Sequence, residues 1–315
     1  MSGPVKVVVA LGGNALEEKS LPPTAASQLQ VARRTAEYLA EMSCPGYELA
    51  IVHGNGPQVG RILLAGETAA EVTPPMPFDV CGAMSQGYIG YHLQQALAGA
   101  LRRRGRDIPV VTVVTQMVVD KDDPAFQNPT KPIGPFYTRE EGERLAAERG
   151  YTVKEDSGRG WRRVVPSPKP RRIVEIDTIR ALWDTTVSIA CGGGGVPVVE
   201  GADGTLEGVA AVIDKDLAAC RLAEEMEADI LMILTEVPAV AIRFGTPEQK
   251  DLGEVTADEL ERYAARGEFG AGSMLPKVEA AVQFVRSAPG RRAMITSLDL
   301  GLKALAGGCG TRVGG

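Results

Sequence analysis

The sequence predicts an α/β fold in which helices cover both faces of a mostly parallel sheet. Short runs of β-branched and apolar residues alternate along the chain with segments whose apolar residues recur every three or four positions. The first of these runs, residues 5–11, is apolar except for Lys6, which is the pattern of a strand buried on both faces. Because helical segments separate most of the strands, the strands are expected to pair in parallel between two helical layers.

These patterns place strands and helices along the whole chain. The predicted strands are residues 5–11, 48–53, 109–115, 187–191, 209–213, 230–235 and 293–296. The predicted helices are residues 25–42, 84–101, 173–183, 217–226, 256–265 and 277–285. Ligands of such sheets bind at the carboxyl ends of the strands, so functional residues are expected there.

Glycine turns follow the first two predicted strands. Gly12 and Gly13 follow the first strand, and Gly54-Asn55-Gly56 follows the second, with Pro57 suited to the first turn of a helix. Glycines let backbone N–H groups approach an anion, and a helix start adds the positive end of its dipole. We interpret the two turns as a shared phosphate cradle, although a glycine pair after a strand is more often only a tight turn. His53, which precedes the second turn, is interpreted as a packed or hydrogen-bonded residue rather than a catalyst.

Residues 120–169 interrupt the alternation of strands and helices. This part of the chain is rich in proline, glycine and charge, and loops of such length are usually functional or disordered. Its aromatic residues, among them Phe136 and Trp161, favour an ordered subdomain, because disordered segments contain few of them. We therefore expect a small inserted subdomain at about residues 120–169, which protrudes from a single domain of residues 1–315.

Three later segments carry further candidates for an anion site. Four consecutive glycines, residues 192–195, leave bare backbone that suits contact with a small flat ligand or another chain segment. Asp214 is placed to cap the helix that follows it, and Lys215 and Asp216 lie on its first turn, although an ordinary cap with an ion pair is the commoner meaning of this pattern. Lys277 opens a helix after a glycine loop, where a cation opposes the helix dipole, and this cost indicates an anion to bind.

Composition excludes several other classes of function. The chain has 34 Lys and Arg against 40 Asp and Glu, and its net charge of -6 disfavours nucleic acid or an anionic membrane as a partner. The five cysteines include no C-x-x-C pair and there are two histidines, so a metal cluster or a disulfide framework is not expected. No apolar run approaches membrane-spanning length, and we expect a soluble, cytoplasmic protein.

Taken together, the motifs resemble the amino-acid kinase family, and within it the carbamate kinases, along essentially the whole chain. The matching segments are ALGGNAL at 10–16, HGNGPQVG at 53–60, CGAMSQG at 81–87, NPTKPIGPFY at 128–137, PSP at 166–168, CGGGGVPV at 191–198, VIDKDLA at 212–218, ILTEV at 233–237 and GSMLPK at 272–277. NPTKPIG and the four glycines are the most specific to the carbamate branch, and Ala10 stands where related kinases carry lysine. Leu275 departs from the pattern, since many relatives have glycine there.

The resemblance implies a three-layer αβα sandwich with an open, mostly parallel sheet and a homodimeric enzyme. It implies reversible phosphoryl transfer between ATP and carbamate, giving ADP and carbamoyl phosphate, and use of this reaction toward ATP synthesis in arginine catabolism. Mg²⁺ would be carried by ATP or ADP rather than by a metal site of the protein. The insertion would act as a lid over the carbamate site.

The resemblance also assigns roles to individual residues. Catalytic roles are implied for Lys131, Lys215, Asp216 and Lys277. Binding of the substrate and its phosphate is implied for Gly12, Gly13, Asn14, Gly54, Asn55, Gly56, Gly193 and Gly194. Nucleotide binding is implied for Asp214, Thr235, Val237, Gly272 and Met274.

Two alternatives stay open at the level of sequence, because a fold alone does not fix a function. The first is a kinase that acts on another small carboxylate or a phosphonate, against which Ala10 and the NPTKPIG segment weigh. The second is a catalytically inactive nucleotide-binding sensor of the same fold. The full set of three lysines and Asp216 weighs against such a loss of activity.

Overall fold

The main sheet of the protein is mixed but almost entirely parallel. The computed structural model describes residues 3–18, 20–156 and 158–315. Across these residues the main sheet contains, in spatial order, β15 (Glu254–Thr256), β17 (Thr311–Gly314), β16 (Arg292–Ser297), β12 (Ile230–Thr235), β1 (Val5–Leu11), β2 (Tyr47–His53), β9 (Val187–Ile189) and β3 (Val110–Thr112). The pair β16–β17 is antiparallel and the other neighbouring pairs are parallel. The predicted fold class is confirmed.

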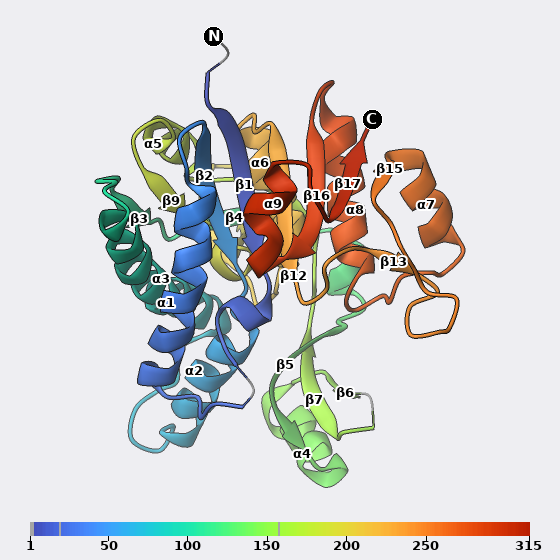
Figure 1. Ribbon diagram of the computed structural model, residues 1–315. Coiled ribbons are helices and arrows are strands. Elements are labelled where there is room, and N and C mark those ends of the chain that lie inside the picture. Colours follow the sequence, from blue (N-terminus) through green and yellow to red (C-terminus); the bar gives the residue numbers. More distant parts are fainter. Residues whose placement is uncertain (1–2, 19, 157) are drawn as a thin grey trace.

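Helices cover both faces of this sheet, so the core is divided into two apolar layers (Figure 1). Successive side chains of a strand point to opposite faces, and β1 shows the consequence: Val8 and Ala10 lie in one layer, and Val7, Val9 and Leu11 in the other. The helices packed on the first layer are α5 (Ile176–Leu182), α6 (Lys215–Glu225), α7 (Ala257–Ala265) and α8 (Leu275–Ser287). Those on the second are α1 (Ala25–Met42), α3 (Phe78–Arg103) and α9 (Gly301–Leu305).

Smaller elements extend this body. A second sheet has the order β11 (Leu206–Gly208), β10 (Val196–Glu200), β4 (Gln116–Val119) and β8 (Pro170–Ile173), and β13 (Ala241–Ile242) pairs with β14 (Lys250–Asp251). Short 3-10 turns are η1 (Gly13–Ala15), η2 (Pro124–Phe126), η3 (Gly192–Gly194) and η4 (Leu298–Leu300). Within the three described stretches, no helix is long and apolar enough to cross a membrane.

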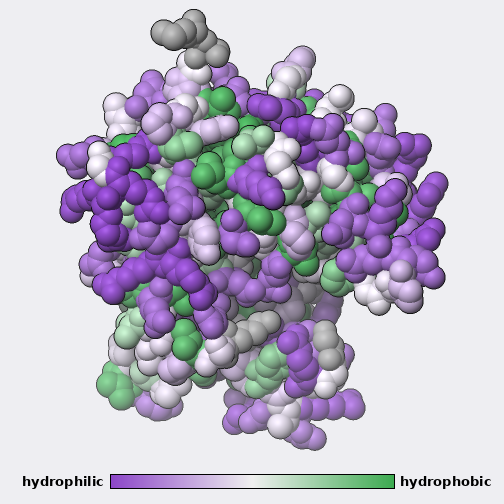
Figure 2. Space-filling view, viewed as in Figure 1, coloured by the Kyte–Doolittle hydropathy of each residue, from purple (hydrophilic) through white to green (hydrophobic). Residues whose placement is uncertain are grey.

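Residues 131–165 form a separate unit that projects from the main body (Figure 1). Its sheet has the order β5 (Lys131–Tyr137), β7 (Trp161–Val165) and β6 (Val153–Glu155), and α4 (Arg139–Arg149) packs on it. Helix α4 begins with a capping box, in which Thr138 and Glu141 each bind the other's backbone N–H. The unit lies opposite α2 (Gly56–Thr68), and Figure 2 shows the two parts as separate lobes along the lower edge of the molecule.

One local prediction was wrong, and one helix was missing from the predicted elements. Residues 209–213 do not form a strand: the N–H groups of Val209 and Val212 bind the carbonyl oxygens of Pro197 and Pro166, which lie on different segments. The apolar side chains of Ala211 and Ile213 are buried in the core without a strand partner, so periodicity alone was misleading. The start of helix α2 agrees with the position expected for Pro57, but the helix was not among the predicted ones, because its glycines resemble a turn in sequence.

Candidate active site

The glycine turn after β1 lies against the neighbouring strand β12. The N–H of Gly12 donates to the carbonyl oxygen of Leu234 at 3.0 Å, and a Cβ on Gly12 would lie only 2.9 Å from that oxygen. Glycine at this position therefore lets the turn pack directly on β12. Gly13 and Asn14 follow in η1 and are exposed. Because β1 also pairs with β2 up to the Leu11–His53 register, the turns after both strands lie at the same edge of the sheet.

The turn after β2 leads straight into helix α2. Asn55 precedes the helix, Gly56 begins it, and Pro57 occupies its first turn, where proline costs no hydrogen bond. The free N–H groups of this helix start give a site that attracts anions. Lys215 lies over the turn, since a Cβ on Gly54 would be 3.4 Å from Cδ of that lysine.

His53 at the end of β2 is fully buried and acts as a structural residue. Its Nδ1 is hydrogen-bonded to the carbonyl oxygen of Gly54 at 2.8 Å. Burial lowers the pKa of His53 to about 4, so the imidazole is neutral at physiological pH. This agrees with its interpretation as a packed residue, and it holds the Gly54 peptide in place.

The first turn of α6 carries the main charge cluster. Asp214 caps the helix by accepting the N–H of Asp216 at 2.9 Å. The carboxylate of Asp216 is 2% exposed and lies between two cations, with Lys215 Nζ 2.5 Å from Oδ1 and Lys277 Nζ 3.0 Å from Oδ2. Burial opposes ionisation of Asp216, but the charges and hydrogen bonds of both lysines outweigh it and hold the pKa of this carboxyl below its usual range.

Lys277 reaches this cluster from the start of α8. Helix α8 begins at Leu275, so Lys277 lies in its first turn, and its Nζ also donates to the carbonyl oxygen of Ser273 at 3.2 Å. Leu275, the residue that departs from the family pattern, is thus the first residue of this helix, two positions before the lysine. The side chains of Met274 and Leu275 pack against the core.

Lys131 joins the cluster from the projecting unit. It is the first residue of β5, and its Nζ lies 3.2 Å from Oδ2 of Asp214. Asp214 thus caps α6 with one carboxylate oxygen and binds a lysine of the projecting unit with the other. The structure in this way brings Lys131, Lys215, Asp216 and Lys277 together around one helix start.

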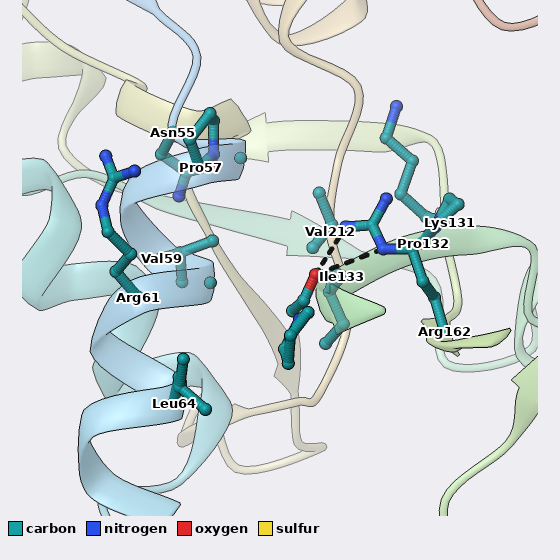
Figure 3. A pocket seen from close by; sticks show the side chains of 14 residues that line it. Asn55, Pro57, Val59, Arg61, Leu64, Lys131, Pro132, Ile133, Arg162 and Val212 are labelled. Atoms are coloured by element: carbon teal, nitrogen blue, oxygen red, sulfur yellow. Dashed lines mark hydrogen bonds between the residues drawn. The ribbon is translucent and has the colours of Figure 1, made fainter. Parts of the chain in front are cut away.

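A cavity of about 430 Å³ separates α2 from β5 (Figure 3). Its lining residues are Asn55, Gly56, Pro57, Val59, Gly60, Arg61, Leu64, Lys131, Pro132, Ile133, Gly134, Pro135, Arg162 and Val212. Arg162 donates two hydrogen bonds, of 2.9 and 3.2 Å, to the carbonyl oxygen of Gly134 and binds Asp156 at 3.1 Å, which braces β5 on the cavity side. The start of α2 and Lys131 therefore line the same cavity.

The four-glycine segment, residues 192–195, forms a buried backbone wall behind Asn55, and Gly193 and Gly194 do not line the cavity between α2 and β5. Gly193 and Gly194 have positive φ angles of 66° and 99°, a conformation that favours glycine. A Cβ on Gly193 would lie 2.2 Å from Nδ2 of Asn55, and one on Gly194 would lie 2.3 Å from the carbonyl oxygen of Ile213. The bare backbone thus contacts both the Asn55 side chain and the residue that precedes Asp214.

The residues expected to bind nucleotide lie at the same edge of the sheet. Thr235 ends β12, which pairs with β1, and half-buried Val237 follows it in a turn. Gly272 is exposed in the loop before α8, and Met274 immediately precedes that helix. Their role in nucleotide binding stays a prediction.

Sequence reasoning missed two residues of this site. Ser85 on α3 accepts a hydrogen bond from Nδ2 of Asn55 at 2.8 Å, and Arg162 lines the cavity. Ser85 lies within the CGAMSQG motif, but nothing in the sequence around it indicates a role for this serine. Arg162 appeared in sequence only as one of several basic residues near Trp161.

The fold and the site define a class of protein, an α/β enzyme in which three lysines meet around the start of one helix. The model of the amino acid kinase family matches residues 5–297, and the chain belongs to this family. Its relatives include carbamate kinases of Pyrococcus horikoshii (54% identical; 98% of this chain and 99% of the relative) and Clostridium perfringens (53%; 98% and 99%). The solved structure of carbamate kinase from Giardia lamblia bound to AMP-PNP superposes with a TM-score of 0.93 at 43% identity, covering 99% of both chains. The resemblance to carbamate kinases is confirmed.

Proposed function

We propose that the protein is a carbamate kinase, which transfers a phosphoryl group reversibly between ATP and carbamate. The proposal is carried by one observation: three lysines on three separate elements meet around Asp214 and Asp216, beside the glycine turns of β1 and β2. Relatives that match over their full length at more than 50% identity are carbamate kinases. This similarity does not favour the alternatives, a kinase of another small carboxylate or a phosphonate, or an inactive nucleotide-binding sensor.

Phosphoryl transfer to carbamate requires positive charge and correct positioning of the reactants, but no general base. Carbamate is already an anion, so its oxygen needs no deprotonation before it attacks the γ-phosphorus. The difficulty is the repulsion between two anions while negative charge spreads over the oxygens of the transferring group. Lys215 and Lys277 stabilise that charge, and their shared partner Asp216 fixes where the two ammonium groups lie.

The projecting unit supplies the third cation. Lys131 lies at the base of this unit, at its junction with the cavity, so residues of about 120–169 serve as a lid that closes over the carbamate. The turns at Gly12, Gly13, Asn14, Gly54, Asn55 and Gly56 bind the phosphoryl group and carbamate, with the wall of Gly193 and Gly194 behind them. Asp214, Thr235, Val237, Gly272 and Met274 contact the nucleotide.

Mg²⁺ enters with ATP or ADP, because the two carboxylates at the centre of the lysine cluster are already engaged. The described residues contain no group of three or more His, Cys, Asp or Glu side chains that would hold a metal ion. Both oxygens of Asp216 bind lysines, and those of Asp214 bind Lys131 and a backbone N–H. The ion, when bound, neutralises charge on the phosphates and keeps most of its ligands from the nucleotide and water.

The enzyme acts as a cytoplasmic homodimer, and one face offers a surface for the second copy. Strand β3 is an edge of the main sheet, and α3 beside it exposes Met84 and Tyr91, which are 48% and 60% accessible. Val114, just after β3, is 49% accessible. An exposed edge with apolar side chains is typical of an interaction surface. Light scattering on the purified protein measures the oligomeric state, and a monomer would contradict this part of the proposal.

The decisive experiment is ATP formation from ADP, Mg²⁺ and carbamoyl phosphate, with Lys131→Ala as the comparison. Rapid synthesis by the native protein that is lost in the variant supports the reaction and the role of the projecting unit. A folded, ADP-binding protein that makes no ATP would overturn the proposal. A panel of other acyl phosphates and small carboxylates would then separate another acceptor from an inactive sensor. Direction in the cell, toward ATP in arginine catabolism, is part of the same proposal.

A further inference from the structure

A buried serine that does not line the cavity holds the side chain of Asn55. Ser85 lies on α3 and is fully buried. Its Oγ is 2.6 Å from the carbonyl oxygen of Gly82, one turn earlier in the helix, and 2.8 Å from Nδ2 of Asn55. Asn55 itself lines the cavity beside the start of α2.

These two contacts fix which way the Asn55 amide faces. A serine hydroxyl has a single hydrogen, and a carbonyl oxygen can only accept, so Ser85 donates to Gly82. The hydroxyl oxygen must then accept from Asn55, and the atom facing Ser85 must be the amide nitrogen rather than the oxygen. Gly193 adds a steric restraint, because its bare Cα lies against the amide and a Cβ there would be 2.2 Å from Nδ2.

The orientation leaves Oδ1 of Asn55 as the atom available to a ligand. No side chain or backbone N–H in the described part of the chain donates to this oxygen. Oδ1 is a pure acceptor, so it pairs with a ligand that offers an N–H or O–H. Carbamate differs from acetate in one group: an amino group with two N–H donors replaces a methyl group that has none.

We propose that Ser85 is a specificity-determining positioning residue, which orients Asn55 so that Oδ1 accepts a hydrogen bond from the amino group of carbamate. The inference rests on the proposed carbamate kinase function and adds how the site tells carbamate from an isosteric carboxylate. Acetyl phosphate has the same shape as carbamoyl phosphate but leaves Oδ1 without a donor. A site built for a donor rejects the analogue that lacks it.

The test compares the two acyl phosphates as donors to ADP. The preference is the ratio of kcat/KM for carbamoyl phosphate to kcat/KM for acetyl phosphate, measured for the native protein and for Ser85→Ala. In the variant, the amide of Asn55 is free to turn, so kcat/KM for carbamoyl phosphate falls about tenfold while that for acetyl phosphate stays the same. Ser85→Cys, a weaker acceptor of nearly the same size, loses part of the preference.

Two controls separate positioning from a general loss of structure. Ser188→Ala removes another buried serine hydroxyl, whose Oγ has no partner in the described part of the chain, and leaves the preference unchanged. In an Asn55→Ala background, Ser85→Ala changes the preference no further, because Ser85 acts only through Asn55. Melting temperatures of all variants are recorded alongside the kinetics.

The outcomes are distinguishable. An equal loss with both donors, or an unchanged preference in both Ser85 variants, would overturn the inference while leaving the proposed function intact. Failure of the native protein to form ATP from carbamoyl phosphate would overturn the proposed function and this inference with it. A fall in preference confined to the Ser85 and Asn55 variants supports it.

Discussion

Nζ of Lys131 lies 3.2 Å from Oδ2 of Asp214, although 83 residues separate them in the chain. The contact joins the base of the projecting unit to the cap of α6, the helix that carries Lys215 and Asp216. This ion pair therefore links the two parts of the molecule to which we assign roles in phosphoryl transfer. Entry of an anionic substrate would compete with Asp214 for this lysine.

The first prediction concerns Lys131→Ala. Turnover falls on the order of 10²–10³-fold, because a charge donor to the transferring group is lost. The melting temperature changes little, because the Lys131 side chain is 40% exposed and pairs of this kind contribute at most about 1 kcal/mol. Steady-state kinetics and thermal unfolding of the same preparation check both parts.

Arg171→Ala is the matched control for that variant. It breaks an exposed ion pair of similar length, 3.0 Å to Asp120, that does not line the cavity. Neither turnover nor melting temperature should change. Retention of more than a tenth of native turnover by Lys131→Ala would remove this lysine from the reaction.

Much of the fold followed from local patterns, and the limits of prediction have physical causes. The strands 5–11 and 230–235 and the helix 25–42 have the predicted bounds, because continuous apolar runs and a clear helical period are strong local signals. Residues 209–213 carry a similar apolar run, but its hydrogen bonds go to two other segments, which the sequence does not encode locally. The missed helix α2 contains glycines at 56, 60 and 66, which weaken any helical signal.

At the site, too, some features could be predicted from local sequence, whereas others depend on tertiary packing. The sequence placed Lys215 and Asp216 together on the first turn of a helix, and the structure joins their side chains there. The approach of Lys131 and Lys277 to this helix depends on tertiary packing, and only resemblance to a family indicated it. Ser85 is an ordinary serine in the middle of a helix, and its meaning appears only when Asn55 lies beside it in space.

The second prediction separates catalysis from stability at Lys277. Lys277→Ala lowers turnover on the order of 10²–10³-fold and destabilises the protein by about 1–3 kcal/mol, because buried Asp216 loses one of two charged partners. Asp216→Asn in the same background removes the carboxylate that still pairs with Lys215 and leaves that half-buried ammonium without a counter-charge. It should lower the stability further and restore none of the turnover, as shown by denaturant unfolding and kinetics. Recovery of turnover in the double variant would argue that Lys277 serves only to balance Asp216.

The third prediction is a pH dependence that originates at His53. Burial lowers the pKa of His53 from 6.5 to about 4 in the folded protein, so between these values the unfolded chain binds more protons. Stability contributed by this group is complete above pH 6.5 and is lost as the pH falls to about 4, by about 3 kcal/mol in total. Urea unfolding across this range measures the slope.

His53→Asn provides the comparison for that slope. Asparagine keeps a donor near the carbonyl oxygen of Gly54 but does not titrate. The stability of the variant should vary less between pH 6.5 and pH 4 than that of the native protein, whatever its absolute value. Parallel curves for the two proteins would assign the pH dependence to other groups.

The last prediction tests whether the buried glycine wall, residues 192–195, controls the position of α6, the helix that begins at Lys215. Gly194 has a φ of 99°, and a Cβ there would lie 2.3 Å from the carbonyl oxygen of Ile213, the residue before Asp214. Gly204 has a similar φ of 81° but no heavy atom within 4 Å of its Cβ position. Gly204→Ala therefore isolates the cost of the backbone conformation, about 1–2 kcal/mol, at no cost to turnover.

Gly194→Ala has the same cost of a left-handed backbone conformation and, in addition, a steric clash between its Cβ and the carbonyl oxygen of Ile213. To make room, the backbone at Ile213 must shift, and Asp214, which caps α6 and binds Lys131, shifts with it. We expect a larger loss of stability than for Gly204→Ala and, unlike in that variant, a fall in turnover at saturating substrate, because the lysines around α6 leave their positions. Equal effects of the two substitutions on unfolding and kinetics would mean that the wall at Gly194 is only a tight turn and that the position of Asp214 is set elsewhere.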